Sequence, residues 1–148
     1  MSRTTESELV DASLKEVWDL YFDPDRWRAW VDGFAAVDRS DGYPEVGGTL
    51  VWRSNPAGRG TVNERVLEHS PRTRHRIEWS DPESSGELLS EFAVEGESVR
   101  VRLTVDYRLP RRGPFAWLTD RLFVRGQVQG SLRRTLLRFK TEAEERPG

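Results

Sequence analysis

The sequence predicts an α+β fold, in which a curved antiparallel sheet of six to seven strands wraps around one long C-terminal helix, with two short helices after the first strand. Three observations lead to this prediction. The chain has 148 residues, a length that suits one domain, so residues 1–148 are expected to form a single unit. Apolar and polar residues alternate through the middle of the chain, which is typical of half-buried strands. Towards the end, apolar residues recur every three or four positions, as on one face of a helix.

Before the sheet, the chain is expected to form an edge strand, over residues 3–10, and two short helices. Ser13 and Glu16 form a capping box, in which the two residues satisfy each other's backbone N–H at the start of a helix. The apolar residues that follow share one helical face: Leu14, Val17, Trp18 and Tyr21. A second helix is predicted to start at Asp23 and Pro24, since Asp is a good N-cap and Pro is tolerated at the first helical position.

Residues 34–109 are predicted to form strands joined by tight turns. The clearest strand covers residues 99–109, where an apolar residue at every second position alternates with Arg, Thr or Asp. A turn at Glu95-Gly96-Glu97 separates this strand from a similar alternation over residues 88–94. Shorter patterns predict further strands over residues 49–53, 60–69 and 75–79.

The last part of the chain is predicted to be one long helix that begins near Gly113. One face of this helix, here called its seam, is formed by residues that follow one another at alternating spacings of four and three: Leu118, Leu122, Arg125, Gln129, Leu132, Leu136, Phe139 and Ala143. About 30 residues at 1.5 Å each give a helix of roughly 45 Å, whereas a domain of this size is roughly 38 Å across. The helix is therefore expected to cross the whole domain and to pack against the curved sheet.

This order of elements resembles the helix-grip fold of the START-like, or SRPBCC, superfamily. Stretches spread over nearly the whole chain are similar to its polyketide cyclase/dehydrase and lipid-transport branch: Val17-Trp18, residues 23–27 with Trp30, residues 47–50, residues 60–71, residues 77–79 and the helix of residues 113–139. The resemblance implies a cavity between the long helix and the concave sheet, which holds an apolar or aromatic molecule. It does not imply one activity, because the superfamily includes lipid carriers, cyclases, hormone receptors and chaperone-activating domains. No catalytic signature of the family can be carried over residue by residue.

Two polar residues interrupt the apolar seam of the long helix at its middle. A guanidinium buried without a partner is very costly, so Arg125 and Gln129 are candidates to line a cavity and orient a polar group of a ligand. Gly126 and Gly130 would widen the space beside them. The alternative is that the 3.6-residue period of a helix drifts off the seam and turns Arg125 to solvent at a sheet edge.

Five aromatic residues are candidate ligand contacts, because they fall on expected inner faces or at the small helices: Trp27, Trp30, Trp52, Trp79 and Tyr107. Ordinary core packing is the alternative for each of them. Glu64 alternates with Val62 and Val66, so its carboxylate is expected to point inward as a candidate general base, unless a bulge shifts the register. His75 shares a face with Ile77 and is a candidate acid–base catalyst, or a histidine bonded at the rim of the core.

Composition excludes several classes of site. The chain has no Cys and only two His, so we expect no disulfide and no metal site. No phosphate-, dinucleotide- or zinc-binding motif is present, so no cofactor is expected. Acidic residues are spread among the basic ones, including the set Arg111, Arg112, Arg133, Arg134 and Arg138, which argues against nucleic acid as a partner. No apolar stretch is long enough to span a membrane and the N-terminus does not resemble a secretory signal, so a cytoplasmic location is expected.

The functional hypothesis from the sequence is binding of a small hydrophobic or aromatic molecule, lipid-like or polyketide-like, under the long helix. A first alternative is an enzyme of the cyclase/aromatase type, which catalyses aldol closure and dehydration with Glu64 or His75 as the base and Arg125 as the oxyanion stabiliser. A second alternative is a protein-interaction domain with a filled core. Whether there is turnover, and whether the chain forms a homodimer, are left open.

Overall fold

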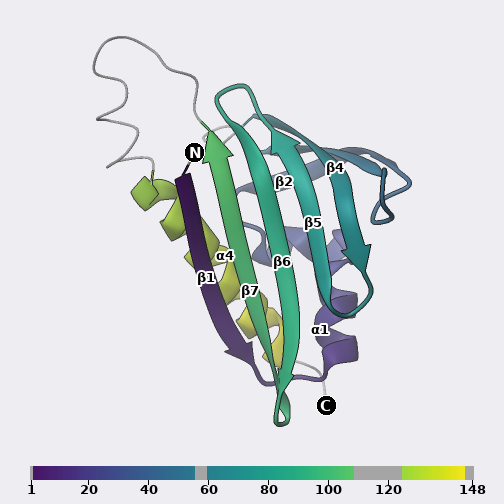
Figure 1. Cartoon of the computed structure of the whole chain (residues 1–148), viewed down its shortest axis with the longest axis vertical. Coiled ribbons are helices and arrows are strands. Elements are labelled where there is room, and N and C mark those ends of the chain that lie inside the picture. The colour runs from purple at the N-terminus through teal and green to yellow at the C-terminus, as the bar shows by residue number, and fades with distance from the viewer. Residues whose placement is uncertain (1, 56–59, 109–124, 146–148) are drawn as a thin grey trace.

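A seven-stranded antiparallel sheet forms the framework of the protein (Figure 1). The computed structural model describes residues 2–55, 60–108 and 125–145. The strand order in the sheet is β1-β7-β6-β5-β4-β3-β2, so β1 pairs with β7 and the remaining neighbours are consecutive in the chain. The strands are β1 (Ser2–Val10), β2 (Phe34–Asp41), β3 (Thr49–Ser54), β4 (Thr61–Ser70), β5 (Arg74–Ser80), β6 (Ser85–Glu95) and β7 (Ser98–Arg108).

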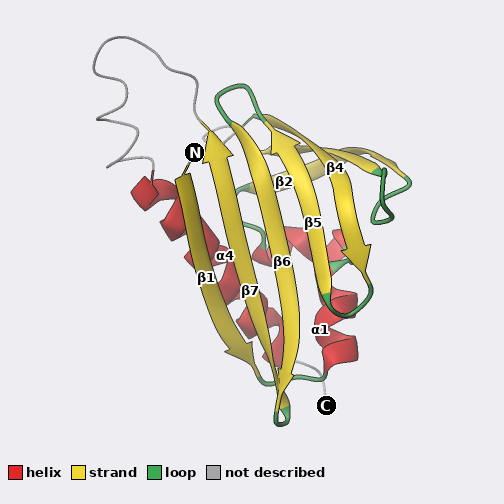
Figure 2. Cartoon of the chain, in the orientation of Figure 1, coloured by secondary structure: helices red, strands yellow, loops and turns green. Residues whose placement is uncertain are grey.

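The described helices lie on one face of the sheet (Figure 2), here called the inner face. They are α1 (Leu14–Tyr21), the 3₁₀ helix η1 (Pro24–Arg26), α2 (Trp27–Trp30) and α4 (Arg125–Glu144). The predicted caps are present, because Ser13 accepts a hydrogen bond from the backbone N–H of Glu16 and Asp23 accepts one from that of Asp25. None of the described helices is long and apolar enough to cross a membrane.

The α4 helix packs its apolar side into the core and runs along the edge strand β1. Four of its side chains are buried: Leu132, Leu136, Phe139 and Ala143. Polar bonds fix it to β1, because the Gln129 amide donates to Glu6 at 3.0 Å and the Lys140 ammonium donates to the backbone oxygen of Leu9 at 2.7 Å. The same helix therefore covers the inner face and closes the β1 edge of the sheet.

The structure confirms the predicted α+β class, with a curved antiparallel sheet, short helices after the first strand and a long C-terminal helix. Seven strands are present, including β2, which the sequence patterns did not define as a separate strand. The second predicted helix consists of η1 and α2. Residues 113–124 of the predicted long helix, with Leu118 and Leu122 of its seam, lie outside the described residues.

Candidate functional site

The inner face of the sheet is filled by aromatic rings at one end, here called the closed end, at the level of Ser90 and Phe92. Tyr21 packs its ring against Phe92 and Phe139, with ring centroids 5.2 and 5.9 Å apart, and Trp30 lies 4.8 Å from Phe139. The Tyr21 hydroxyl is hydrogen-bonded to the Ser90 hydroxyl in this buried setting. The closed end is therefore packed with aromatic rings, and the Tyr21–Ser90 pair within it is satisfied.

The other end of the inner face, here called the open end, is less completely covered. It consists of one cross-strand row: Leu50, Glu64, Trp79, Gly86 and Tyr107. Glu64 and Trp79 remain half-buried, as does Leu88 in the adjacent row, although all three project from the face that carries the core. These three side chains are thus only partly covered at this end of the sheet.

A carboxylate and an indole form the polar centre of the open end. The Trp52 indole N–H on β3 donates to Glu64 Oε2 on β4 at 2.8 Å. This hydrogen bond holds the carboxylate on the inner side of the sheet, as the alternation of Glu64 with Val62 and Val66 predicted. An inward carboxylate with a fixed orientation can accept a hydrogen bond or a proton from a bound molecule.

Two tyrosines share the interior with Glu64. Burial raises the pKa of Tyr21, the hydrogen bond with Ser90 opposes this, and the negative charge of Glu64 raises the pKa further. Burial also raises the pKa of Tyr43 well above its ordinary value, again with a contribution from the charge of Glu64. Both hydroxyls therefore stay protonated at neutral pH, and that of Tyr21 is already bonded to Ser90.

Three buried polar atoms of inner residues have no hydrogen-bond partner in the described part of the chain. They are Trp30 Nε1, His75 Nε2 and the Tyr107 hydroxyl oxygen. Their residues are 4%, 3% and 3% exposed. His75 has one partner on its other nitrogen, since its Nδ1 lies 3.0 Å from Nδ1 of His69. Buried polar atoms are normally satisfied, so each unpartnered one calls for an explanation such as a water or a ligand.

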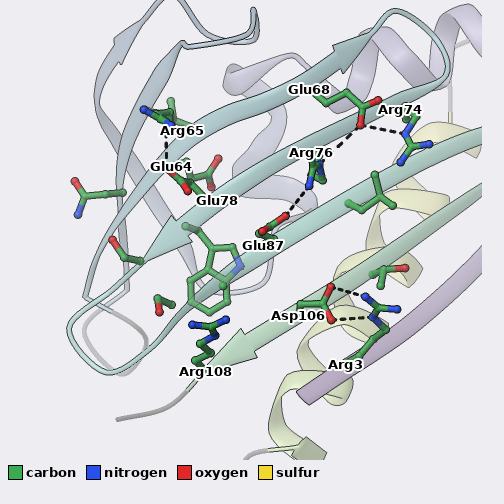
Figure 3. Close-up of a pocket in the computed structure, with 18 of the residues that line it drawn as sticks. Arg3, Glu64, Arg65, Glu68, Arg74, Arg76, Glu78, Glu87, Asp106 and Arg108 are labelled. Atoms are coloured by element: carbon green, nitrogen blue, oxygen red, sulfur yellow. Dashed lines mark hydrogen bonds and ion pairs between the residues drawn. The ribbon is translucent and has the colours of Figure 1, made fainter. Parts of the chain in front are cut away.

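A broad groove of about 1280 Å³ is lined mainly by residues of the opposite, outer face of the sheet (Figure 3). Four residues of the row of the open end also line it: Leu50, Glu64, Trp79 and Gly86. Its floor is a network of arginines and carboxylates on adjacent strands. Arg76 lies between Glu68 and Glu87, with its Nη1 3.0 Å from Glu87, and Arg3 pairs with Asp106 at 2.8 Å. The carboxylates of these pairs are neutralised by neighbouring arginines, and exposed pairs of this kind contribute little to stability. The polar residues at alternate strand positions predicted a solvent-facing side of the sheet, but no pattern in the sequence indicated a groove on it.

The predicted aromatic contacts lie mostly in the core. Trp27, Trp30, Trp52 and Tyr107 are buried, and Trp79 is half-buried at the open end. The Trp27 indole donates to the backbone oxygen of Tyr21 at 2.8 Å, so this residue has a structural partner. Of the five, the row of the open end brings together Trp79 and Tyr107, and Trp52 reaches the same end through Glu64.

Arg125 and Gln129 do not lie beneath α4, and this part of the prediction is corrected. Both side chains are exposed. Helical spacing places them on the same side of α4 as Leu132 and Leu136, but the first turns of the helix lie beside the edge strand β1 rather than under the sheet (Figure 1). Gln129 accordingly bonds Glu6 of β1. The expected oxyanion stabiliser at position 125 is therefore absent from the inner face.

The two candidate catalytic residues face inward but lie apart. Glu64 is at the open end, whereas His75 pairs in register with Ser90 at the closed end. The four-residue separation of His75 and Trp79 along β5 corresponds to roughly 13 Å. Tyr43, whose ring lies 5.6 Å from that of His75, could not be predicted as its neighbour because it lies in a loop, where no periodicity indicates its direction. Among the described residues, no group of three or more potential ligands could hold a metal ion.

Comparison with protein families finds one match over almost the whole chain. The family described as polyketide cyclase/dehydrase and lipid transport matches residues 1–144. Comparison with curated proteins finds no match.

Solved structures with the same fold include proteins of different kinds. The Aha1 dimer from Colwellia psychrerythraea is 15% identical, with a TM-score of 0.72 and full coverage of both chains. Truncated norcoclaurine synthase from Thalictrum flavum is 14% identical, with a TM-score of 0.71 over 99% of this chain and 95% of that one. DynU16, a protein of the dynemicin biosynthetic locus, is 20% identical, with a TM-score of 0.66 over 98% of this chain and 48% of that one. At these identities the likeness concerns the fold alone.

Proposed function

Because the chain belongs to the polyketide cyclase/dehydrase and lipid transport family, we propose that it binds a small hydrophobic or aromatic molecule at the open end of the inner face. The observation that carries this proposal is the incomplete cover of Glu64, Trp79 and Leu88. These side chains project from the core face, yet they stay half-buried, so there is apolar surface next to a carboxylate that a guest molecule can cover. Burying such surface contributes roughly 25 cal/mol per Å².

The side chains around this surface favour an aromatic guest with a polar group. Trp79 offers a flat indole face, on which an aromatic ring can stack. Glu64 is held by Trp52 and accepts hydrogen bonds, so the polar group that meets it is a donor such as a hydroxyl. Ligand pockets of this kind combine a mainly apolar lining with a few placed polar groups.

The first experiment is native mass spectrometry of the protein purified from its own host. Under this proposal the native spectrum shows the protein with a bound small molecule, and the spectrum of the unfolded protein shows the chain alone. Binding of 2-naphthol by the emptied protein then tests the site. Glu64→Gln is expected to weaken binding about three- to tenfold, because a charged acceptor makes the stronger hydrogen bond.

The matched control is Glu78→Gln, which makes the same change on the outer face of the neighbouring strand β5. This variant should bind 2-naphthol like the unchanged protein. Equal loss in both variants would contradict a site at Glu64. Absence of both a co-purified molecule and 2-naphthol binding would reject the proposal and favour a protein-interaction domain.

A second candidate function is catalysis of an aldol-type ring closure, and the inward Glu64 carboxylate, held by the Trp52 indole, favours it. Glu64 accepts a proton from a carbon between two carbonyl groups, and the carbanion attacks a further carbonyl carbon to form the new C–C bond. The alkoxide that forms takes the proton back from Glu64, and loss of water from the resulting alcohol then gives the unsaturated ring.

Binding and catalysis are separated by the same variant. If the protein is an enzyme, Glu64→Gln should abolish turnover of the molecule recovered from the protein while retaining measurable binding. Turnover that persists in this variant removes Glu64 as the base. If no turnover is seen in the unchanged protein either, the chain is a carrier.

A further inference from the structure

Tyr107 has a hydroxyl that the packing of the core leaves without a partner. The residue lies on β7, is 3% exposed, and belongs to the row of the open end. Its hydroxyl has no hydrogen bond within the described part of the chain. A buried hydroxyl without a partner lowers stability, and phenylalanine would fill the same volume without that cost. The hydroxyl therefore needs a partner that is absent from the chain described here.

The row of the open end places this hydroxyl opposite Glu64. The register pairs Glu64 with Trp79, Trp79 with Gly86, and Gly86 with Tyr107. Three strand spacings of about 4.8 Å separate β4 from β7, which is roughly 14 Å along the sheet. The row thus carries a polar residue on β4, Glu64, and another on β7, Tyr107.

Between the Glu64 carboxylate and the Tyr107 hydroxyl, the row of the open end forms a flat surface. Trp79 supplies an indole, and Gly86 supplies no side chain at all. Gly86 cannot be replaced by a larger residue without rearrangement, because a Cβ there would lie 2.0 Å from the backbone oxygen of Asp106. The close approach of β6 to β7 therefore keeps the row free of a side chain next to Tyr107.

We propose that the molecule bound at the open end is flat and carries an oxygen function at each end, one bonded to Glu64 and the other to the Tyr107 hydroxyl. This inference rests on the proposed binding function and adds the shape and polarity of the ligand. The group at Glu64 is a donor such as a hydroxyl, since a carboxylate only accepts. The group at Tyr107 is a hydroxyl or a carbonyl, since a phenol both donates and accepts.

Two probes that differ at one end test this assignment. 2-Hydroxyanthraquinone has one hydroxyl, and 2,6-dihydroxyanthraquinone has a second one at the far end of the same ring system. The unchanged protein should bind the second probe about five- to tenfold more tightly, the effect of one added hydrogen bond. In Tyr107→Phe this advantage should disappear, while the affinity for the first probe stays within about twofold.

Stability provides an independent readout on the same variant. Tyr107→Phe should unfold at the same temperature as the unchanged protein or above it, because the removed hydroxyl has no partner in the free state. A lower unfolding temperature would show a structural partner and overturn the assignment. Thr104→Val, which removes an outward hydroxyl from the same strand, is the control and should leave the ratio of the two affinities unchanged.

The outcomes distinguish this inference from the proposed function. If both probes bind but their affinity ratio is the same in the unchanged protein and in Tyr107→Phe, the role of Tyr107 is wrong and the binding function stands. If neither probe binds, both are rejected. If the second probe loses its higher affinity in Tyr107→Phe but keeps it in Thr104→Val, the result supports a ligand with an oxygen function at each end.

Discussion

His75 is the residue through which acid is expected to destabilise the fold most directly. It is 3% exposed and is surrounded by rings, with Phe22 at 4.8 Å and Tyr43 at 5.6 Å between centroids. Burial, followed by the charge of His69, lowers the pKa of His75 from 6.5 to about 3. In the unfolded chain the same imidazole takes up a proton near pH 6.5. Between these values the unfolded state binds more protons, so stability falls as the pH falls.

The variant His75→Phe should flatten this acid dependence. The unchanged protein is expected to lose stability from about pH 6.5 downward, by up to about 5 kcal/mol at pH 3 on the scale of 1.36 kcal/mol per pKa unit. The variant keeps an aromatic ring in the cage but has no proton to gain. Urea unfolding at pH 7, 6, 5 and 4 measures the difference. Parallel pH dependences in both proteins would show that other groups dominate.

At the scale of single residues, the sequence correctly predicted the face of the sheet from which a side chain projects where the strand alternation was present. Alternation placed Glu64 and His75 inward, and the structure orients both in that way. It could not show that they lie at opposite ends of the face, because strand register is set by pairing between distant segments. Arg125 was misplaced for a related reason, since helical spacing defines a side of α4 but not what covers that side.

Among the elements, α4 depends on one carboxylate for its attachment to the loop after α2. Asp32 accepts hydrogen bonds from Ser131 at 2.8 Å and from Arg134 at 3.1 Å, and lies 3.2 Å from Arg138. Its backbone N–H donates to the Thr135 hydroxyl. Burial alone raises the pKa of Asp32, but the hydrogen bonds from Arg134 and Ser131 outweigh it, and the pKa is lowered.

Asp32→Ala should therefore destabilise the protein by roughly 1–3 kcal/mol, because several donors lose one shared acceptor. The control Asp19→Ala removes a carboxylate whose described ion pair is the exposed one with Lys15 on α1, and should cost less than about 0.5 kcal/mol. Thermal unfolding at neutral pH checks both values. A similar small effect in the two variants would mean that the apolar side of α4 alone holds the helix.

Helix caps and strand alternation made most elements predictable. The box of Ser13 and Glu16 marked the start of α1, and the eleven-residue alternation over residues 99–109 marked β7. The strand β2 was not resolved as an element because its pattern is irregular: the pairing with β3 shifts register after Phe34 and again after Val37. Such shifts break the two-residue period on which the prediction depends.

Across the whole molecule, the two sheet edges differ in their protection. The edge strand β1 is bonded to β7 on one side and contacts α4, whereas the edge strand β2 is bonded to β3, and its second half is exposed. Hydrogen exchange should therefore be slowest at Val99 and Val101 in the paired interior and fastest over residues 38–41. Uniform protection across the sheet would contradict this order.

The pairing of β1 with β7 also has a consequence for the way the chain is made. The two strands meet across large separations, from 89 positions between Val10 and Val99 to 105 between Ser2 and Tyr107. At 5–20 residues per second, the ribosome needs roughly 5 to 20 seconds to deliver the partner of the first strand. During synthesis β1 therefore has no partner strand to form hydrogen bonds with until β7 has emerged from the ribosome. We expect the sheet to be completed near the end of synthesis rather than strand by strand as the chain grows.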